Sequence, residues 1–247
     1  MIKFFRKIRY NLMKKGKTGR YFKYAIGEII LVVVGILIAL QINNWNENRK
    51  KQLLKKSYAT NLISDLQKDT TQLNARLKYN ENALIALDSI QMFLDTTDLS
   101  PKELTDLSLL RNRIIGLRII NTYNVNTFNI LVSSGNIDLF TNHFTNELME
   151  LNRLQLSELK ISSSNSQSYF DGISRHGNQF LKDNGFLSNA NLKQFLTSNY
   201  NPKEFLTFQI NSLALQRHTI RRYIDLTTQV NTQTEKVLLL LNKKTGL

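Results

Sequence analysis

The sequence predicts an all-α protein in which one N-terminal transmembrane helix continues into an antiparallel helical bundle. A first observation is that residues 25–42 carry only two polar side chains. Apolar residues then recur at helical spacing, and the 247 residues include only two prolines and ten glycines, which favours long uninterrupted helices. The expected domains are a basic cytoplasmic tail over residues 1–23, a transmembrane helix over 24–45 and an extracytoplasmic bundle over 46–247.

The predicted span has the length and flanks of a membrane helix. A bilayer core needs about 20 mostly apolar residues, and Tyr24 and Trp45 extend the stretch into the interfacial layers that aromatic rings favour. In lipid a helix is expected, because an isolated strand would leave its backbone groups unpaired. A buried core helix or a cleaved signal peptide is an alternative, but the stretch ends in QINNW at residues 41–45, a poor cleavage site.

Two features inside the span indicate a helix–helix contact. Glu28 is a carboxylate near the basic end, where it is costly unless it reaches water or a partner. Gly35 and Ala39 form a small-xxx-small pair that lets a second helix approach closely. At about 100° per residue, these three residues and Ile42 share one side of the helix. Snorkelling of Glu28 to the interface is the open alternative.

The basic charge is concentrated before the span. Nine of the 33 lysines and arginines lie in residues 1–23, which contain no acid, so the other 24 face 19 acidic residues. Such a tail favours the cytoplasmic side and anionic lipid head groups. The residues expected to contact head groups are Lys3, Arg6, Lys7, Arg9, Lys14, Lys15, Lys17 and Arg20. Interleaved apolar residues such as Phe4 and Ile8 are typical of a short amphipathic helix on the membrane; a nucleic-acid arm is disfavoured.

The charges that follow the span set the predicted topology. Five basic residues, Arg49, Lys50, Lys51, Lys55 and Lys56, stand against Glu47 on that side. Because the preceding tail is more basic, the N-terminus is expected in the cytoplasm. The protein is therefore expected in a bacterial inner membrane as a single-pass protein with a periplasmic C-terminal domain.

The same stretch carries a family resemblance. GEIILVVVGILIALQINNWNENRK, residues 27–50, resembles the hallmark of an uncharacterised family of single-pass membrane proteins of Bacteroidota. The basic opening, from FFRKIR at residues 4–9 to YAIG at 24–27, is similar to the start of that family. LVSSGNIDLFTN, residues 131–142, resembles its turn between helices. The resemblance implies a membrane topology and an envelope setting, and it implies no activity.

The bundle helices follow from start signals, turns and spacing. A leucine row at residues 66, 73, 87 and 94, with Asn80 at the missing step, predicts a seam resembling that of a coiled coil. A second row of the same period is Ile63, Thr70, Leu77 and Leu84. Ser100–Glu103 and Asn201–Glu204 are helix starts with cap, proline and acid in order, and Gly135 is expected to take positive φ in a turn. The expected helices cover residues 46–94, 100–115, 122–133, 139–181, 188–198 and 201–241, with a kink or a solvent-facing patch over 162–168.

No pattern of catalytic or metal-binding residues is found. His143, His176 and His218 are separate, and only His143 has a carboxylate one turn on, at Glu147, which is too few ligands for a metal. The sequence has no cysteine, so no thiolate site is expected. Ser133 and Ser134 beside Gly135 are interpreted as a turn, and Glu147 and Glu150 as a solvated face. No cofactor is expected.

One basic cluster remains, formed by Arg217, Arg221 and Arg222 beside Tyr223. It could dock an anion or an acidic partner, although a solvated helix face is favoured.

The function expected from these features is a membrane-anchored periplasmic interaction module, a subunit or adaptor of an envelope assembly without catalysis of its own. The expected partners are the lipid bilayer and another membrane or periplasmic protein, or a second copy of the chain. The alternative is a ligand-sensing bundle. It would signal through a partner, because residues 1–23 are too short for an output domain.

Overall fold

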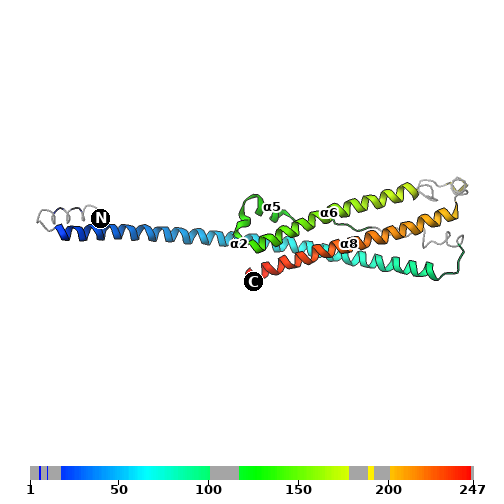
Figure 1. The fold of residues 1–247 in the computed structure, drawn as a ribbon, viewed down its shortest axis with the longest axis horizontal. Helices are drawn as coiled ribbons and strands as arrows, with labels where there is room; N and C mark the ends of the chain where they lie inside the picture. The colour runs from blue at the N-terminus through cyan, green and yellow to red at the C-terminus, as the bar shows by residue number, and fades with distance from the viewer. Residues whose placement is uncertain are drawn as a thin grey trace. The chain divides into compact units, whose positions relative to one another are not determined.

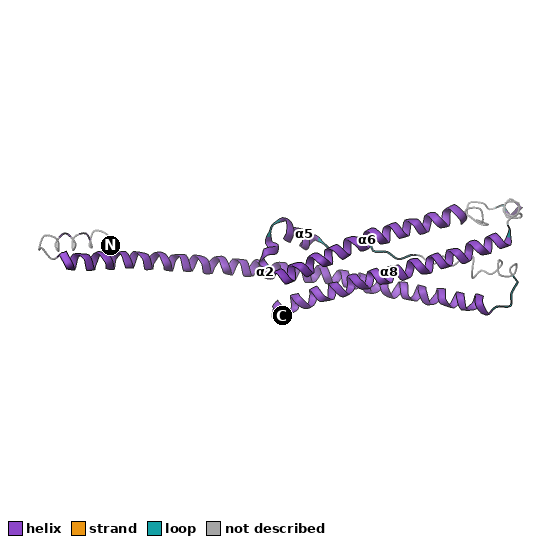
Figure 2. Ribbon diagram, viewed as in Figure 1, coloured by secondary structure: helices purple, strands orange, loops and turns teal. Residues whose placement is uncertain are grey.

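The computed structural model describes residues 6, 10, 18–100, 117–177, 189–191 and 201–245, and the described part of the chain contains no strand (Figure 2). Its main elements are helices and one 3-10 turn (Figure 1). They are α2 (Thr18–Thr96), α5 (Asn126–Ser133), the 3-10 helix η1 (Asn136–Leu139), α6 (Asn142–Gly177) and α8 (Pro202–Thr245). The predicted all-α class, with an apolar N-terminal helix and helices packed on one another, is confirmed.

The chain divides into two compact units, Met1–Ser57 and Tyr58–Leu247. Helix α2 begins in the first and ends in the second without interruption, as the absence of Pro and Gly from residues 43–51 predicts. In the first unit, the large apolar side chains between Ile29 and Leu40 are 47–64% exposed. One helix is therefore long and apolar enough to cross a membrane, which is compatible with a single-pass protein.

In the second unit, the part of α2 after Ser57 packs with α6 and α8 as a helical bundle (Figure 1). Helix α8 runs antiparallel to α6, because hydrogen bonds join Tyr223 to Ser162 and Gln233 to Glu147. Helix α6 runs in the same direction as α2, as contacts from Arg76 to Ser162 and from Asp69 to Gln155 require. The described part of the connection between them, from Arg118 to Thr127, returns along α2 and leads into α5 and η1.

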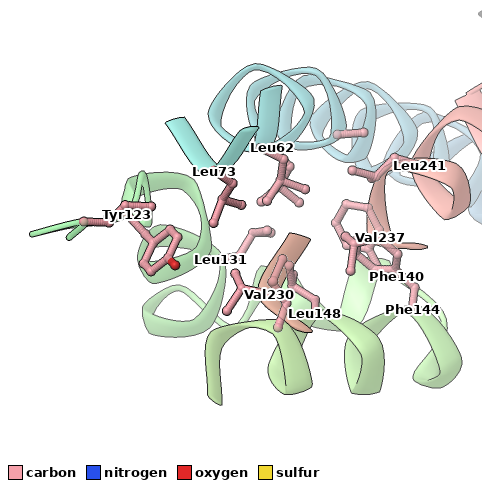
Figure 3. Packing of buried hydrophobic residues seen from close by; sticks show 14 residues of the cluster. Leu62, Leu73, Tyr123, Leu131, Phe140, Phe144, Leu148, Val230, Val237 and Leu241 are labelled. Atoms are coloured by element: carbon pink, nitrogen blue, oxygen red, sulfur yellow. The ribbon is translucent and has the colours of Figure 1, made fainter. Parts of the chain in front are cut away.

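The core lies between the three helices and α5 (Figure 3). Leu62 and Leu73 of α2 meet Phe144 and Leu148 of α6, while Leu131 enters from α5. Val230, Val237 and Leu241 complete the cluster from α8. Phe140 and Phe144 stack with ring centroids 4.8 Å apart, a geometry that adds to their burial.

The buried face of α2 has a regular three–four spacing over nine turns. Residues 66, 73, 80 and 87 of the predicted row are buried, and Leu94 at its end is only partly buried. The second predicted row is partly buried, and Ile63 and Leu84 pack against the core clusters. Its members are Ile63, Thr70, Leu77 and Leu84. The buried positions are Ala59, Leu62, Leu66, Asp69, Leu73, Arg76, Asn80, Ala83, Leu87 and Ile90.

Several helix ends differ from the prediction. Helix α5 begins at Asn126 rather than near residue 122, because residues 117–125 form an irregular segment held by α2. Helix α6 begins at Asn142 rather than 139, since η1 occupies the preceding residues. The expected helix over 100–115, the end of α6 after 177 and most of the helix over 188–198 lie outside the described residues.

Two local predictions are confirmed. Gly135 has φ of 70° and begins η1, a left-handed conformation that glycine adopts without a side-chain clash. Helix α8 begins at Pro202, and the backbone N–H of Lys203 donates to Asn201 Oδ1 at 3.0 Å. The helix extends to Thr245, four residues past the expected end.

Candidate functional site

A charged pair lies inside the bundle core. Arg76 of α2 and Glu158 of α6 are each 1% exposed, and Arg76 Nη1 donates to Glu158 Oε1 at 2.5 Å. Both occupy the three–four rows that face the core, so helix periodicity places them there. Charges that are removed from water are costly unless they are paired and fully hydrogen-bonded. The pair is therefore the central polar feature of the bundle.

Hydroxyl groups add hydrogen bonds to this pair, while the buried Nε–H of Arg76 has no hydrogen-bond partner among the described residues. Arg76 Nη2 donates to Ser162 Oγ at 3.1 Å, and Ser162 Oγ donates to Glu158 Oε1 at 2.7 Å. Tyr123 OH donates to Glu158 Oε2 at 3.0 Å. The Tyr223 ring lies 5.2 Å from the guanidinium carbon of Arg76, within the range of a cation–π interaction.

The tyrosine hydroxyls are held protonated in this setting. Burial, followed by the negative charge of Glu158, raises the pKa of Tyr123 far above its ordinary value. Burial also raises the pKa of Tyr223, whose hydroxyl donates to the backbone oxygen of Ser162 at 2.9 Å. Both hydroxyls therefore act as hydrogen-bond donors, and neither is activated as a nucleophile.

Two carboxylates on α2, those of Asp65 and Asp69, bind the segment that leads into α5. Asp69 Oδ1 accepts from the backbone N–H of Asn124 at 3.0 Å and from its side-chain amide at 2.7 Å. One turn earlier, Asp65 Oδ2 accepts from Thr127 Oγ1 at 2.6 Å. Gln155 of α6 donates to Asp69 Oδ2 at 3.3 Å. These bonds start α5 and connect it to α2 and α6.

The Asp69 carboxyl is held less acidic than usual. Desolvation by burial raises its pKa above 3.8, and the bonds from Asn124 lower it only in part. The negative charge of Asp65 also raises it. The Asp69 carboxyl therefore serves as a hydrogen-bond acceptor, and burial makes its ionised form less favourable than in water.

The geometry of this polar layer favours a structural role, the alignment of the helices, over catalysis on a bound substrate. Arg76, Glu158 and Ser162 are 0–1% exposed, so a substrate cannot reach them in the closed bundle. A slip of any helix by one turn would separate the charges inside the core. We interpret the layer as the device that fixes how α2, α6 and α8 align.

The predicted contact residues of the span lie in the first unit. Gly35 and Ala39 are exposed, and no atom lies within 4 Å of the position that a Cβ of Gly35 would take. The Glu28 side chain is partly buried and has a partner within the chain. A contact with a second helix stays a prediction.

Most residues of the predicted head-group contact are outside the described part. Arg6 is described and exposed, and Arg20 lies in α2. The remaining predicted positions, Lys3, Lys7, Arg9, Lys14, Lys15 and Lys17, lie outside the described residues.

Two of the three predicted histidines have described side chains, and that of His176 lies outside the described part. His143 and His218 are exposed on different helices, and no cluster of three metal-ligating side chains occurs among the described residues. Ser134 Oγ donates to the backbone oxygen of Ile130 at 2.6 Å, consistent with a turn.

The two glutamates that were assigned to a solvated face differ. Glu150 pairs with the exposed Arg153 at 2.6 Å, as that assignment expects. Glu147 instead joins α6 to α8, because it accepts from Lys236 at 2.7 Å and from Gln233 at 2.8 Å. These hydrogen bonds, chiefly that of Lys236, lower its pKa.

The predicted basic cluster is divided by the fold. Tyr223 points into the core, whereas Arg222 is exposed. Arg217 and Arg221 line a groove of about 530 Å³ between α2 and α8, and Arg217 Nη2 contacts Asp88 at 2.6 Å. A second groove, of about 670 Å³, lies between α6 and α8 and includes the oppositely charged Lys203 and Glu204.

A known protein family covers most of the chain. The family described as a family of unknown function, DUF6090, matches residues 28–213. The chain belongs to this family. The DUF6090 match begins at Glu28 inside the apolar stretch and ends at Leu213 in α8, so it includes α5, η1 and the whole of α6. No curated protein and no solved structure matches the chain.

Membership of an uncharacterised family is therefore shown, and DUF6090 membership carries no activity with it. The Bacteroidota origin and the hallmark motif stay expectations from the resemblance.

The polar layer was missed by the sequence reasoning. Residues 162–168 were expected to form a kink or a solvent-facing patch. Helix α6 is continuous there and residues 163–168 are exposed or partly exposed, but Ser162 is fully buried. A usable signal existed: Asp69, Arg76 and Glu158 stand at three–four spacing from buried leucines. Reading polar residues at those positions as core residues would have found them.

Proposed function

We propose that the protein is a membrane-anchored helical interaction module of a bacterial cell envelope, a subunit or adaptor without catalysis of its own. The observation that carries the proposal is the apolar, solvent-exposed part of α2 between Ile29 and Leu40. A helix that is apolar on all sides is covered by lipid or protein. The basic tail before it favours a cytoplasmic N-terminus and a periplasmic bundle, with the span in the inner membrane.

The bundle supports an interaction role through its rigidity. A buried ion pair adds little to stability, and its best-attested use is to specify a register. A surface that spans three helices keeps its shape only if the helices keep their alignment. The layer around Arg76 and Glu158 would provide this alignment for a partner that binds the surface of α6 or α8.

A topology map tests the proposal. A reporter that is active only outside the cytoplasm is fused after Leu247, and a matched fusion is made after Lys23, before the span. The expected result is activity from the first fusion only. A full-length product that stays in the soluble fraction, or a silent reporter after Leu247, would overturn the membrane topology.

The partner is tested at the predicted face of the span. Because the sequence has no cysteine, single cysteines give unambiguous crosslinks. Ala39→Cys is expected to form a disulfide-linked dimer on oxidation in membranes, whereas Leu37→Cys, about 180° from Glu28 on the helix, is the matched control. Equal crosslinking of the two variants would contradict a second copy at this face, and co-purification in mild detergent would then test a different partner.

The groove between α2 and α8 favours a second candidate, a ligand-sensing bundle that signals through a partner. Its volume of about 530 Å³ lies in the range of about 300–1,000 Å³ for small-molecule sites. A thermal-shift screen of the full chain in nanodiscs separates the two candidates, because an interaction module needs no small ligand.

A further inference from the structure

The groove between α2 and α8 has an apolar wall. Helix α2 supplies Leu87, Ile90 and Leu94, and α8 supplies Ile210 and Leu213. Leu87 and Ile90 are 3% exposed, so the groove extends down to the core, whereas Ile210 is exposed at its rim. A simple anion would leave this wall uncovered, so the lining favours a ligand with a hydrocarbon part.

The same groove carries two arginines and a histidine toward the C-terminal end of α8. Arg217, His218 and Arg221 follow the apolar residues on one face of that helix. Arg221 is exposed, and no ion pair joins it to another described residue. The acid that lines the groove, Asp95, comes from the C-terminal end of α2, and Gln91 donates to it at 3.5 Å.

One buried donor in the groove lacks an acceptor. Arg217 uses Nη2 for Asp88 and Nη1 for Gln91. Its Nε–H is buried and has no hydrogen-bond partner among the described residues. Such a donor is costly unless an acceptor reaches it. A negatively charged group at this end of the groove would lie beside the two arginines that line it.

From these observations we propose that the groove binds a single-chain anionic amphiphile, with its hydrocarbon chain against Leu87, Ile90 and Leu213 and its anionic head at Arg217 and Arg221. A volume of about 530 Å³ fits a ligand of drug size and favours one chain. The proposal does not depend on the topology or on the partner of the span.

The test is equilibrium binding of radiolabelled laurate to the full chain in phosphatidylcholine nanodiscs, with empty nanodiscs as background. Saturable binding of one laurate per chain is expected. Dodecanol, which has the chain without the charge, should compete about fivefold more weakly, since an exposed ion pair contributes up to about 1 kcal/mol. Inorganic phosphate, which has the charge without the chain, should not compete.

Two variants and one matched control locate the site. Arg221→Gln is expected to weaken laurate binding about fivefold, whereas Arg222→Gln, its exposed neighbour outside the groove, should leave binding unchanged. Ala214→Trp, at an exposed position of the groove, should fill it and abolish binding. Circular dichroism checks that each variant keeps its helix content.

Three results would overturn the proposal: laurate binding no greater than that of empty nanodiscs, equal competition by dodecanol, or equal effects of the two arginine substitutions. If the wild type binds no laurate and Ala214→Trp dissociates a dimer of the protein, the groove would be assigned to contact with a second copy of the chain instead. Because binding is measured without the topology reporter, failure here leaves the membrane topology standing.

Discussion

Replacing Arg76 by methionine removes the charge that offsets Glu158 inside the core. Both side chains are 1% exposed, so the remaining carboxylate would be buried without a cation. At about 4 Å between charge centres and an effective dielectric constant of about 20, the attraction is about 4 kcal/mol. Breaking a buried pair in this way costs about 3–5 kcal/mol, and this is the loss in unfolding free energy that we expect.

The companion variant separates the lone charge from the loss of contacts. In Arg76→Met/Glu158→Gln no charge remains, the amide oxygen can accept from Tyr123 OH, and the amide NH₂ can donate to Ser162 Oγ. Replacing a buried pair with neutral side chains of similar volume is often near neutral. The double variant should therefore recover most of the stability that Arg76→Met loses.

Urea unfolding of the full chain in nanodiscs, followed by circular dichroism at 222 nm, measures both variants. With a slope of about 2 kcal/mol per M, a loss of about 3–5 kcal/mol moves the midpoint down by about 1.5–2.5 M. Arg153→Met, which breaks the exposed pair with Glu150, is the control and should show no measurable shift. An Arg76→Met midpoint equal to that of the control, or a double variant as unstable as Arg76→Met, would refute the reasoning.

Three further predictions concern the loop, the core and the turn. The folded protein binds the Asp69 proton more tightly than the unfolded chain, so this group's contribution to stability falls as the pH rises from 3.8 through the raised pKa. The free energy of unfolding of Asp69→Asn should therefore rise relative to that of the wild type between pH 4 and pH 7. A difference in unfolding free energy that is constant with pH would contradict this. Leu131→Ala, at a fully buried position, should cost about 2–5 kcal/mol in urea unfolding, whereas the exposed Val132→Ala should change stability by less than about 0.5 kcal/mol. Gly135→Ala should cost about 1 kcal/mol through φ of 70° alone, because an added Cβ meets no atom within 4 Å; an equally stable variant in thermal unfolding would exclude a strained turn.

Local signals in the sequence were sufficient for much of the fold. The apolar stretch ending at Ile42, the absence of Pro and Gly after it and the Asn201–Pro202 start each act within a few residues. Their physical basis is backbone geometry and side-chain hydrophobicity, which do not depend on distant partners. The start of α5 was placed incorrectly because its cause is distant: the carboxylates of Asp65 and Asp69 lie 55–62 residues away from the groups they bind.

The candidate sites show the same division. The sequence marked Arg217 and Arg221 as a cluster, but only packing against α2 placed an apolar wall beside them. Helical spacing placed Asp69 and Arg76 in the buried row of α2, but it could not identify the partners that compensate for their burial. Burial of a charge becomes favourable only when its partner arrives from another helix.

By itself the sequence determined an apolar helix with a basic tail, followed by helices whose apolar residues recur every three or four positions. The tertiary structure alone decided that α2 and α6 run in the same direction and that a charged pair aligns them. The physical reason is range: helix formation depends on neighbours within one or two turns, whereas the Arg76–Glu158 pair joins residues 82 positions apart.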